Sequence, residues 1–165
     1  MPSNLLSFPN PVNETASRVV AGGVAVIAAS AILTQQPWLS AVLAYGFLAR
    51  VATGPTLSPL GQLATKMVAP RLSSRPKLVA GPPKRFAQGI GAVITVSATL
   101  LTLLWHADLA TYILLAVLLV AATLESAFAF CVGCRIFTVL MRVGLIPPEV
   151  CVACSNLSAY RAPGK

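Results

Sequence analysis

Hydrophobic residues form four long stretches, separated by short segments that contain proline, glycine or polar residues. The stretches run from about residue 19 to 34, 38 to 53, 86 to 105 and 109 to 130. The last two have about the 20 residues that a helix needs to cross a hydrocarbon core about 30 Å thick. The first two are shorter, and the connector 35–37 joins them as a helical hairpin. This pattern predicts an all-α integral membrane bundle of four transmembrane helices.

The composition supports a lipid environment. Of the 165 residues, 56% are hydrophobic and only 10% are charged, whereas about 25% of the residues in a soluble domain are charged. The mean hydropathy is +0.80. Because so few charged side chains could not cover the surface of a soluble domain, we expect the lipid bilayer to solvate most of the chain.

The net charge is +8, and the basic residues are placed unevenly along the chain. The connectors 35–37 and 106–108 contain no Lys or Arg. All twelve cations fall at the other ends of the predicted helices: Arg18, Arg50, Lys66, Arg71, Arg75, Lys77, Lys84, Arg85, Arg135, Arg142, Arg161 and Lys165. Since cations flank membrane spans on the cytoplasmic side, we expect a cell inner membrane protein with both termini and the basic loop 54–85 in the cytoplasm. No nucleic-acid-binding motif accompanies the charge, so no nucleic acid partner is expected.

The predicted domain covers residues 1–156, and residues 157–165 are expected to form a flexible tail. Inside the basic loop, apolar residues recur at helical spacing between Pro59 and Pro70, which predicts a short amphipathic helix at the membrane surface. Asn13 or Thr15 would cap the first helix. The small residues 29–31 also resemble a signal-peptide cleavage site, so removal of this segment stays open.

Glu125 is an acidic residue inside the fourth stretch, about one turn from its predicted cytoplasmic end. An ionisable group there costs about 2–3 kcal/mol, so we expect it to face the bundle and to have a partner. Arg50, at a similar depth in the second stretch, is the preferred partner. The pair either fixes helix register or handles protons beside the cysteines. On one continuous ideal helix, Glu125 and Cys131 would lie about 240° apart, so direct contact is not expected.

The four cysteines form two C-x-x-C pairs, Cys131 with Cys134 and Cys151 with Cys154, separated by sixteen residues. This spacing falls within the C-x2-C-x15–20-C-x2-C pattern of four-thiolate zinc sites. If residues 135–144 continue as a helix, the seven residues that follow are long enough to bring the second pair back to the first. The four cysteines are therefore candidate zinc ligands.

The same residues are candidates for thiol redox chemistry, with Cys131 and Cys134 as the reactive pair and Cys151 and Cys154 as the resolving pair. Residues i and i+3 of a helix share one face, and the guanidinium of Arg135 beside them would lower a thiol pKa. No thioredoxin-like β-α-β pattern surrounds either pair, so a cytoplasmic thioredoxin-like or sulfur-carrier protein would be the partner. A third interpretation is that the cysteines pack as small apolar residues.

Several motifs together resemble one family of bacterial multi-pass membrane proteins, common in actinobacteria and known as a domain of unknown function. They are Pro11-Val12-Asn13, AYGFLARVATGPTLSPLGQLATK (44–66), VAGPPKRFAQGIG (79–91), FCVGCRIFTVLMRVGLIP (130–147) and the closing Cys151 and Cys154. The F-C-x-G-C-R and C-x-x-C motifs are its cysteine signature. The resemblance implies a membrane protein but no particular activity.

Two functions from different classes remain. The first is a membrane-anchored thiol protein without a cofactor, which exchanges electrons or sulfur with a cytoplasmic protein. The second is a non-enzymatic structural or assembly subunit of a membrane complex, in which the four cysteines bind zinc. A transporter is disfavoured because a single intramembrane carboxylate and short helices leave little room for a substrate pathway.

Overall fold

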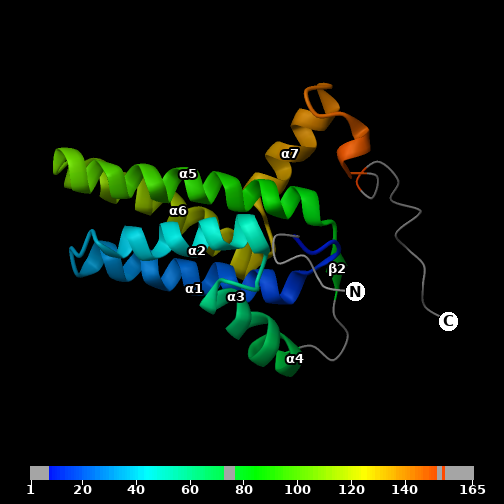
Figure 1. The fold of residues 1–165 in the computed structure, drawn as a ribbon, viewed down its shortest axis with the longest axis horizontal. Coiled ribbons are helices and arrows are strands. Elements are labelled where there is room, and N and C mark those ends of the chain that lie inside the picture. Colours follow the sequence, from blue (N-terminus) through cyan, green and yellow to red (C-terminus); the bar gives the residue numbers. More distant parts are fainter. Residues whose placement is uncertain (1–7, 73–76, 152–153, 155–165) are drawn as a thin grey trace.

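The computed structural model describes residues 8–72, 77–151 and 154. Four long helices lie side by side and form a bundle, with the α1–α2 and α5–α6 hairpins packed against each other (Figure 1). These helices are α1 (Glu14–Leu33), α2 (Leu39–Thr53), α5 (Gly81–Trp105) and α6 (Asp108–Phe128). The described residues therefore confirm the predicted all-α fold.

Three of the helices in the described part of the chain, α1, α5 and α6, are long and apolar enough to cross a membrane. Their outward faces carry exposed apolar side chains, among them Val26, Leu103 and Val120. Such faces suit contact with lipid, since a soluble protein rarely exposes large apolar patches. Helix α2 is also apolar but has only 15 residues.

Two helices begin earlier than the hydrophobicity pattern predicts. Helix α1 begins at Glu14 because the Asn13 Oδ1 accepts hydrogen bonds from the backbone N–H groups of Thr15 (2.9 Å) and Ala16 (3.4 Å). Of the two predicted caps, Asn13 is thus the one used. Helix α5 begins at Gly81, since prolines are tolerated in the first helical turn, where backbone N–H groups have no helical partner.

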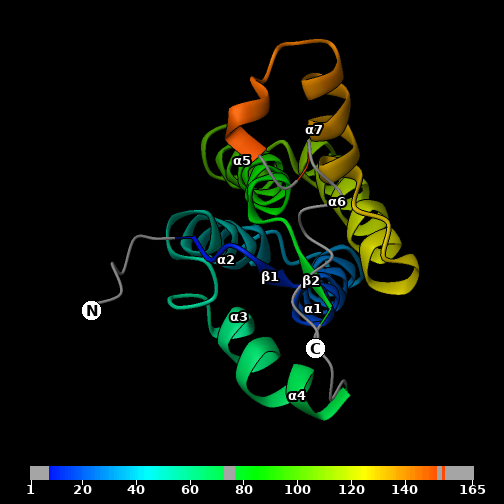
Figure 2. The ribbon, with the colours of Figure 1, turned by 90° about the vertical axis from the view of Figure 1, so that its right-hand side faces the viewer.

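A short antiparallel strand pair ties the starts of α1 and α5 together. Strand β1 (Val12–Asn13) pairs with β2 (Leu78–Val79), in the register Val12 with Val79 (Figure 2). An ion pair of 2.7 Å between Lys77 and Glu14 continues this contact. The pairing brings residues 12–13 and 78–79 together and therefore holds the starts of α1 and α5 at the same end of the bundle.

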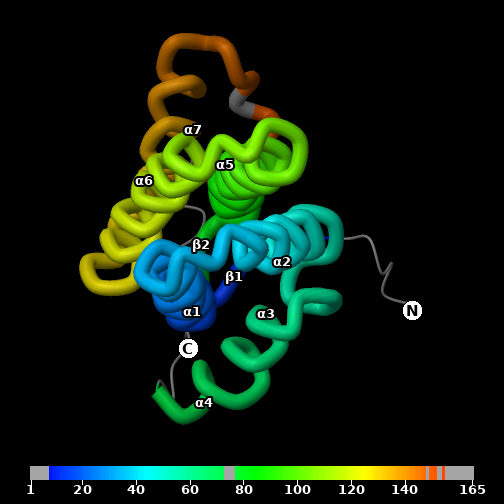
Figure 3. The backbone as a smooth tube through the Cα atoms, turned by 90° about the vertical axis from the view of Figure 1, so that its left-hand side faces the viewer, coloured from blue at the N-terminus to red at the C-terminus, as the bar shows by residue number. Residues whose placement is uncertain are grey.

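The loop predicted as basic and partly helical contains α3 (Pro59–Leu63), a π-helical turn η1 (Ala64–Val68) and α4 (Ala69–Leu72). The three elements follow one another as one nearly continuous helical segment outside the bundle, below α1 (Figure 3). Its N-cap is Ser58, whose Oγ accepts from the Gly61 backbone N–H at 3.3 Å. The predicted short helix is confirmed.

Small and hydroxyl side chains join the helices of the bundle. Ala28 and Ala31 of α1 are fully buried, and a Cβ at Gly22 would meet the Ser126 Oγ of α6 at 3.0 Å. The Thr111 hydroxyl donates to the backbone carbonyl of Ala98 at 3.1 Å and lies 2.9 Å from the Thr102 hydroxyl. Close packing and interhelical hydrogen bonds replace the hydrophobic drive that lipid removes.

The connector between α1 and α2 and the connector between α5 and α6 lie at one end of the bundle. The other end carries the strand pair and the cysteine-containing segments. The strand pair, α7 (Val132–Arg142) and the 3-10 turn η2 (Pro148–Cys151) gather at this second end (Figure 1). Arg18, Arg50 and Lys84 sit near it as well, because they occupy the start of α1, the end of α2 and the start of α5. The cations of these helices are therefore at the same end as the cysteines.

Replacing Thr111 with Val should destabilise the bundle by about 1 kcal/mol, because the change removes a buried interhelical hydrogen bond. The matched control is Thr123→Val, since the exposed Thr123 hydroxyl bonds only to the Leu119 carbonyl of its own helix. Equilibrium unfolding in mixed micelles measures both. Equal effects of the two substitutions would contradict a role for Thr111 in joining α5 to α6.

Candidate thiol site

The site begins where α6 stops. The Arg18 side chain of α1 donates from Nε to the Ser126 carbonyl (3.0 Å) and from Nη2 to the Ala127 carbonyl (3.1 Å). These bonds satisfy carbonyl groups that a helix C-terminus leaves without helical partners. Ala129 then adopts a left-handed conformation with φ 55°, which ends the helix. The chain turns here, so α7 is inclined steeply to the axes of α5 and α6 (Figure 1).

This break removes the continuous helix on which the expected 240° separation of Glu125 and Cys131 was based. That expectation assumed one continuous helix, and the helix ends between the two residues. After the turn at Ala129, Glu125 and Cys131 both line one cavity. The break therefore brings a carboxylate and a thiol of different segments to the same place.

Cys131 is the N-cap of α7. Its Sγ accepts a hydrogen bond from the Cys134 backbone N–H at 3.4 Å, and the Cys134 thiol is in direct contact with it. Cys131 is 8% exposed, and Cys134 is partly buried. A sulfur at a helix N-terminus is stabilised as the thiolate by the partial positive charge of the helix end.

Gly133, between the two cysteines, allows α7 to approach α5 closely. A Cβ at this position would lie 2.6 Å from the Cα of Ala87, so any larger residue would push the two backbones apart. One turn further along α7, the Phe137 ring packs against the Phe86 ring with 5.6 Å between centroids. These two contacts hold Cys131 over the first turns of α5.

Lys84 and Glu125 form an ion pair below the cysteines. The Lys84 Nζ lies 2.6 Å from the Glu125 Oε1, and the side chains are 10% and 16% exposed. The Ser17 hydroxyl of α1 donates to the same carboxylate oxygen at 3.1 Å. The pair thus connects α1, α5 and α6 at one point.

Arg50 does not take the predicted place beside Glu125. Its Nε donates to the Gln88 side chain (2.9 Å), its Nη1 donates to the Ser58 hydroxyl (3.2 Å), and its guanidinium lies 4.5 Å from the centroid of the Phe47 ring. Lys84 takes that place because α5 begins at Gly81 and not at residue 86, which puts Lys84 inside a helix facing the end of α6.

The surroundings separate the acidities of the two thiols. The hydrogen bond from Cys134 lowers the pKa of Cys131 the most, and the positive charge of Lys84 lowers it further, while burial and Glu125 oppose them. The same hydrogen bond, together with burial, raises the pKa of Cys134. Arg135, the predicted source of positive charge, instead lies over the Phe130 ring at 5.3 Å. These effects favour the thiolate form at Cys131 over Cys134.

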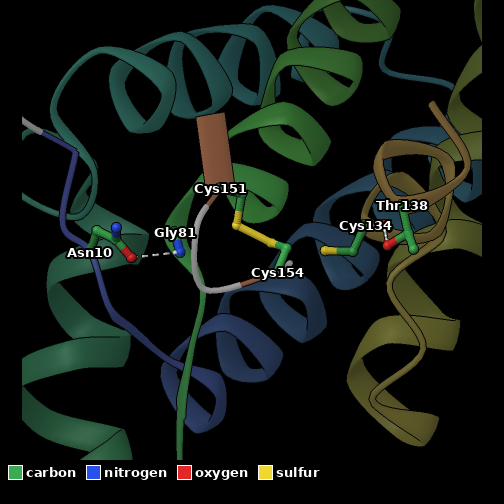
Figure 4. Close-up of a disulfide and its surroundings, with 6 residues drawn as sticks. All are labelled: Asn10, Gly81, Cys134, Thr138, Cys151 and Cys154. Carbon is green, nitrogen blue, oxygen red and sulfur yellow. Dashed lines mark hydrogen bonds between the residues drawn. A yellow bond between two sulfur atoms is a disulfide. The ribbon is translucent and has the colours of Figure 1, made fainter. Parts of the chain in front are cut away.

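The second cysteine pair lies close to the first. Cys151 and Cys154 form a disulfide, and Cys151 is 2% exposed. The Cys134 sulfur points toward the disulfide on the side of Cys154 (Figure 4). The chain does fold back between the two pairs, as the length of the intervening segment predicts.

This arrangement does not fit a four-thiolate zinc site. Such a site needs four unbonded thiolates in a tetrahedron, and the disulfide engages two of the four sulfurs. Within residues 8–72, 77–151 and 154, no three His, Cys, Asp or Glu side chains come together as a group that could hold a metal ion.

Two cavities of about 260 Å³ each meet at Cys131. The inner cavity lies between α1, α2, α5, α6 and α7 and is lined by Arg50, Glu125 and mostly apolar side chains. The surface cavity is lined by Lys84, Arg135 and both Cys131 and Cys134. Cys131 thus borders a cavity on each of two sides.

A family model described as Domain of unknown function (DUF4395) matches residues 12–142. The chain belongs to this family. The matched part includes Cys131, Cys134, Lys84 and Glu125 and ends before Cys151. No curated protein matches the chain. No solved structure matches it either.

Sequence reasoning missed Lys84 and Gly133 as parts of the site. The signal for Lys84 was the pair of prolines before it, which allow a helix to start there. Glycine is about 1 kcal/mol less favourable than alanine inside a helix. The glycine between the two cysteines was therefore a signal that another backbone comes close at Gly133.

Replacing Gly133 with Ala should displace α7 from α5 and raise the pKa of Cys131, because the thiol moves away from Lys84. The matched control is Gly89→Ala in α5, where an added Cβ meets nothing within 4 Å. The rate of Cys131 alkylation as a function of pH measures the pKa. An unchanged profile in Gly133→Ala would show that close packing at this glycine does not position the thiol.

Changes to the two members of the ion pair should shift the pKa of Cys131 in opposite directions. Lys84→Gln removes a favourable positive charge and should raise it, while Glu125→Gln removes an unfavourable negative charge and should lower it further. Lys77→Gln is the control, since the exposed Lys77 pairs with Glu14 instead. The alkylation profile again reports the shift, and shifts of the same sign would contradict the electrostatic account.

Proposed function

We propose that the chain is a four-span inner membrane thiol-disulfide oxidoreductase whose two C-x-x-C pairs face the cytoplasm. The observation that carries the proposal is the position of Cys131. It caps a helix, accepts a hydrogen bond from Cys134 and lies beside a cation, next to a second pair that is oxidised. These surroundings favour the thiolate, which is the form that attacks disulfides. A cysteine that only packs in the core does not require a neighbouring cation or a second thiol.

Four spans follow if α2 crosses the bilayer together with α1. Its 15 residues rise about 22 Å, which is short for a hydrocarbon core of about 30 Å, but local thinning and packing against longer helices compensate for such a mismatch. Placing the cation-bearing end of the bundle in the cytoplasm agrees with the positive-inside rule. The α3–α4 segment, with Lys66 and Arg71, would then lie along anionic lipid headgroups.

The pairs exchange electrons through thiolate attack on a disulfide. The Cys131 thiolate attacks Cys154, and as this sulfur–sulfur bond forms, the Cys151–Cys154 bond breaks and leaves a Cys151 thiolate. Cys134, whose proton passes to Cys151, then bonds to Cys131 and releases the Cys154 thiolate. The single proton of the first pair ends on the second pair, two electrons move with it, and the same steps run in reverse.

The partner on the cytoplasmic side would be a thioredoxin-like or sulfur-carrier protein. The surface cavity reaches both Cys131 and Cys134 and carries the cations Lys84 and Arg135. A partner whose thiolate or persulfide approaches this cavity would meet a favourable potential. The competing function, a structural subunit with zinc on four reduced cysteines, rests on the C-x2-C-x16-C-x2-C spacing alone.

Thiol titration and zinc analysis on the same detergent-purified sample test the proposal. We expect less than 0.1 zinc per chain, as an order of magnitude for adventitious metal, and two dithiol pairs that oxidise reversibly near the cytoplasmic glutathione poise. Cys131→Ser should abolish electron transfer between the pairs, and chelators should have no effect.

Cys134→Ser is the matched variant, because it keeps the nucleophile and should trap Cys131 in a mixed disulfide with a thioredoxin-like protein. About one zinc per chain with unreactive thiols, and equal loosening of the C-terminal segment by any of the four Cys→Ser changes, would establish the zinc subunit and overturn the redox proposal.

A further inference from the structure

The inner cavity lies on the bundle side of Cys131, and its walls are mainly apolar. Its lining includes Val24, Phe47, Ile94 and Leu118, which come from four different helices. Its volume of about 260 Å³ exceeds the roughly 150 Å³ in which an apolar protein cavity holds one benzene ring. One substituted aromatic or quinonoid ring therefore fits the space.

The cavity extends to the outer, apolar surface of the bundle. Two of its lining residues, Val117 of α6 and Ile136 of α7, are 54% and 42% exposed. In a membrane these exposed faces meet lipid tails. A ligand with an apolar tail could therefore keep its ring inside and its tail in the bilayer.

Arg50, one of the residues that line the cavity, has a side-chain nitrogen without a partner. Arg50 is 5% exposed, and its Nη2 is buried without a hydrogen bond, the only such side-chain nitrogen or oxygen among the described residues. A buried donor without a hydrogen bond is unfavourable. A carbonyl oxygen of a ligand that reached this nitrogen would satisfy it.

We propose that this cavity binds the ring of a lipid-soluble quinone, which oxidises the Cys131–Cys134 pair. The inference rests on the proposed thiol function and names its electron acceptor. Cys131 is one of the residues that line the cavity, so a ring bound there would lie beside the thiol pair. Arg50 donates to a quinone oxygen and stabilises the negative charge that develops there during reduction.

The reaction is balanced within these groups and solvent. A bond forms between the Cys131 and Cys134 sulfurs, and the pair loses two electrons and the one proton that Cys134 carries. The quinone gains the two electrons, that proton and a second proton from solvent, and leaves as the quinol. Once a thioredoxin-like partner has reduced the Cys151–Cys154 disulfide to two thiols, that pair can pass two electrons to the new disulfide by exchange.

A small inorganic anion is a poorer occupant of the same cavity. It would pair with Arg50 but would leave most of the apolar lining in contact with a strongly hydrated ion, and burying such an ion is costly. It would also leave the dithiol beside it without an acceptor. The quinone uses the apolar walls, the free donor and the sulfur together.

The test uses the full chain in lipid nanodiscs, with all four cysteines reduced and the reductant removed. Decylubiquinone and the naphthoquinone menaquinone-1 are added separately. With at least one of them, loss of quinone absorbance and formation of disulfide, summed over the two cysteine pairs and detected by alkylation and mass spectrometry, should proceed together in a 1:1 ratio. The Cys131→Ser variant should bind the same quinone without reducing it.

Two variants address the cavity itself. Arg50→Met should slow quinone reduction about tenfold, as expected for loss of a hydrogen bond to a charged group, while Arg85→Met, the matched control, should not, because the exposed Arg85 donates to the Val51 carbonyl outside the cavity. Since Arg50 also bonds to Gln88 and Ser58, Ala121→Phe provides a second variant, which fills the cavity and should block quinone reduction.

The outcomes separate the two proposals. If neither quinone is reduced while the two cysteine pairs still exchange electrons, this inference fails and the thiol function stands. Quinone reduction that persists in Ala121→Phe would show that this cavity is not the quinone site. Binding of phospholipid or fatty acid in preference to either quinone would also contradict the inference. If the pairs do not exchange with each other or with any thiol partner, the proposed function itself fails.

Discussion

The buried ion pair between Lys84 and Glu125 is the contact on which the rest of the site depends. It joins α5 to α6, and the Ser17 hydroxyl adds α1 to the same carboxylate. Removing one member of a buried pair leaves the other charge uncompensated, which costs about 3–5 kcal/mol. The geometry around Cys131 therefore depends on a contact whose loss would strongly destabilise the bundle.

Contacts at the end of α6 and the start of α7 bring Cys131 close to this ion pair. Arg18 holds the end of α6, Ala129 turns the chain, and Gly133 lets α7 settle against Ala87. Together they place a helix N-terminus and its capping sulfur above a charged pair, in a region that is mostly apolar.

Much of the fold could be predicted from the sequence, because hydrophobic stretches and helix-breaking residues report directly on membrane helices. The same local signals gave Asn13 as a candidate cap and the helix after Pro59. The partner of Glu125 could not be predicted in this way. Its identity depends on where α5 begins, and the position of Cys131 depends on the left-handed residue Ala129. Neither feature is visible in hydropathy. The four spans and the membrane orientation remain proposals.

The hairpin connectors have a consequence for how the chain enters a membrane. In the proposed orientation, the segments that must cross the bilayer are the turns after α1 and after α5, which contain no Lys or Arg and only Asp108 as an acid. Each hairpin can therefore insert as a pair of helices without transferring a basic side chain across the hydrocarbon. The charged half of the protein stays on the side where it is synthesised, so the ion pair and the cysteines assemble without leaving the cytoplasm.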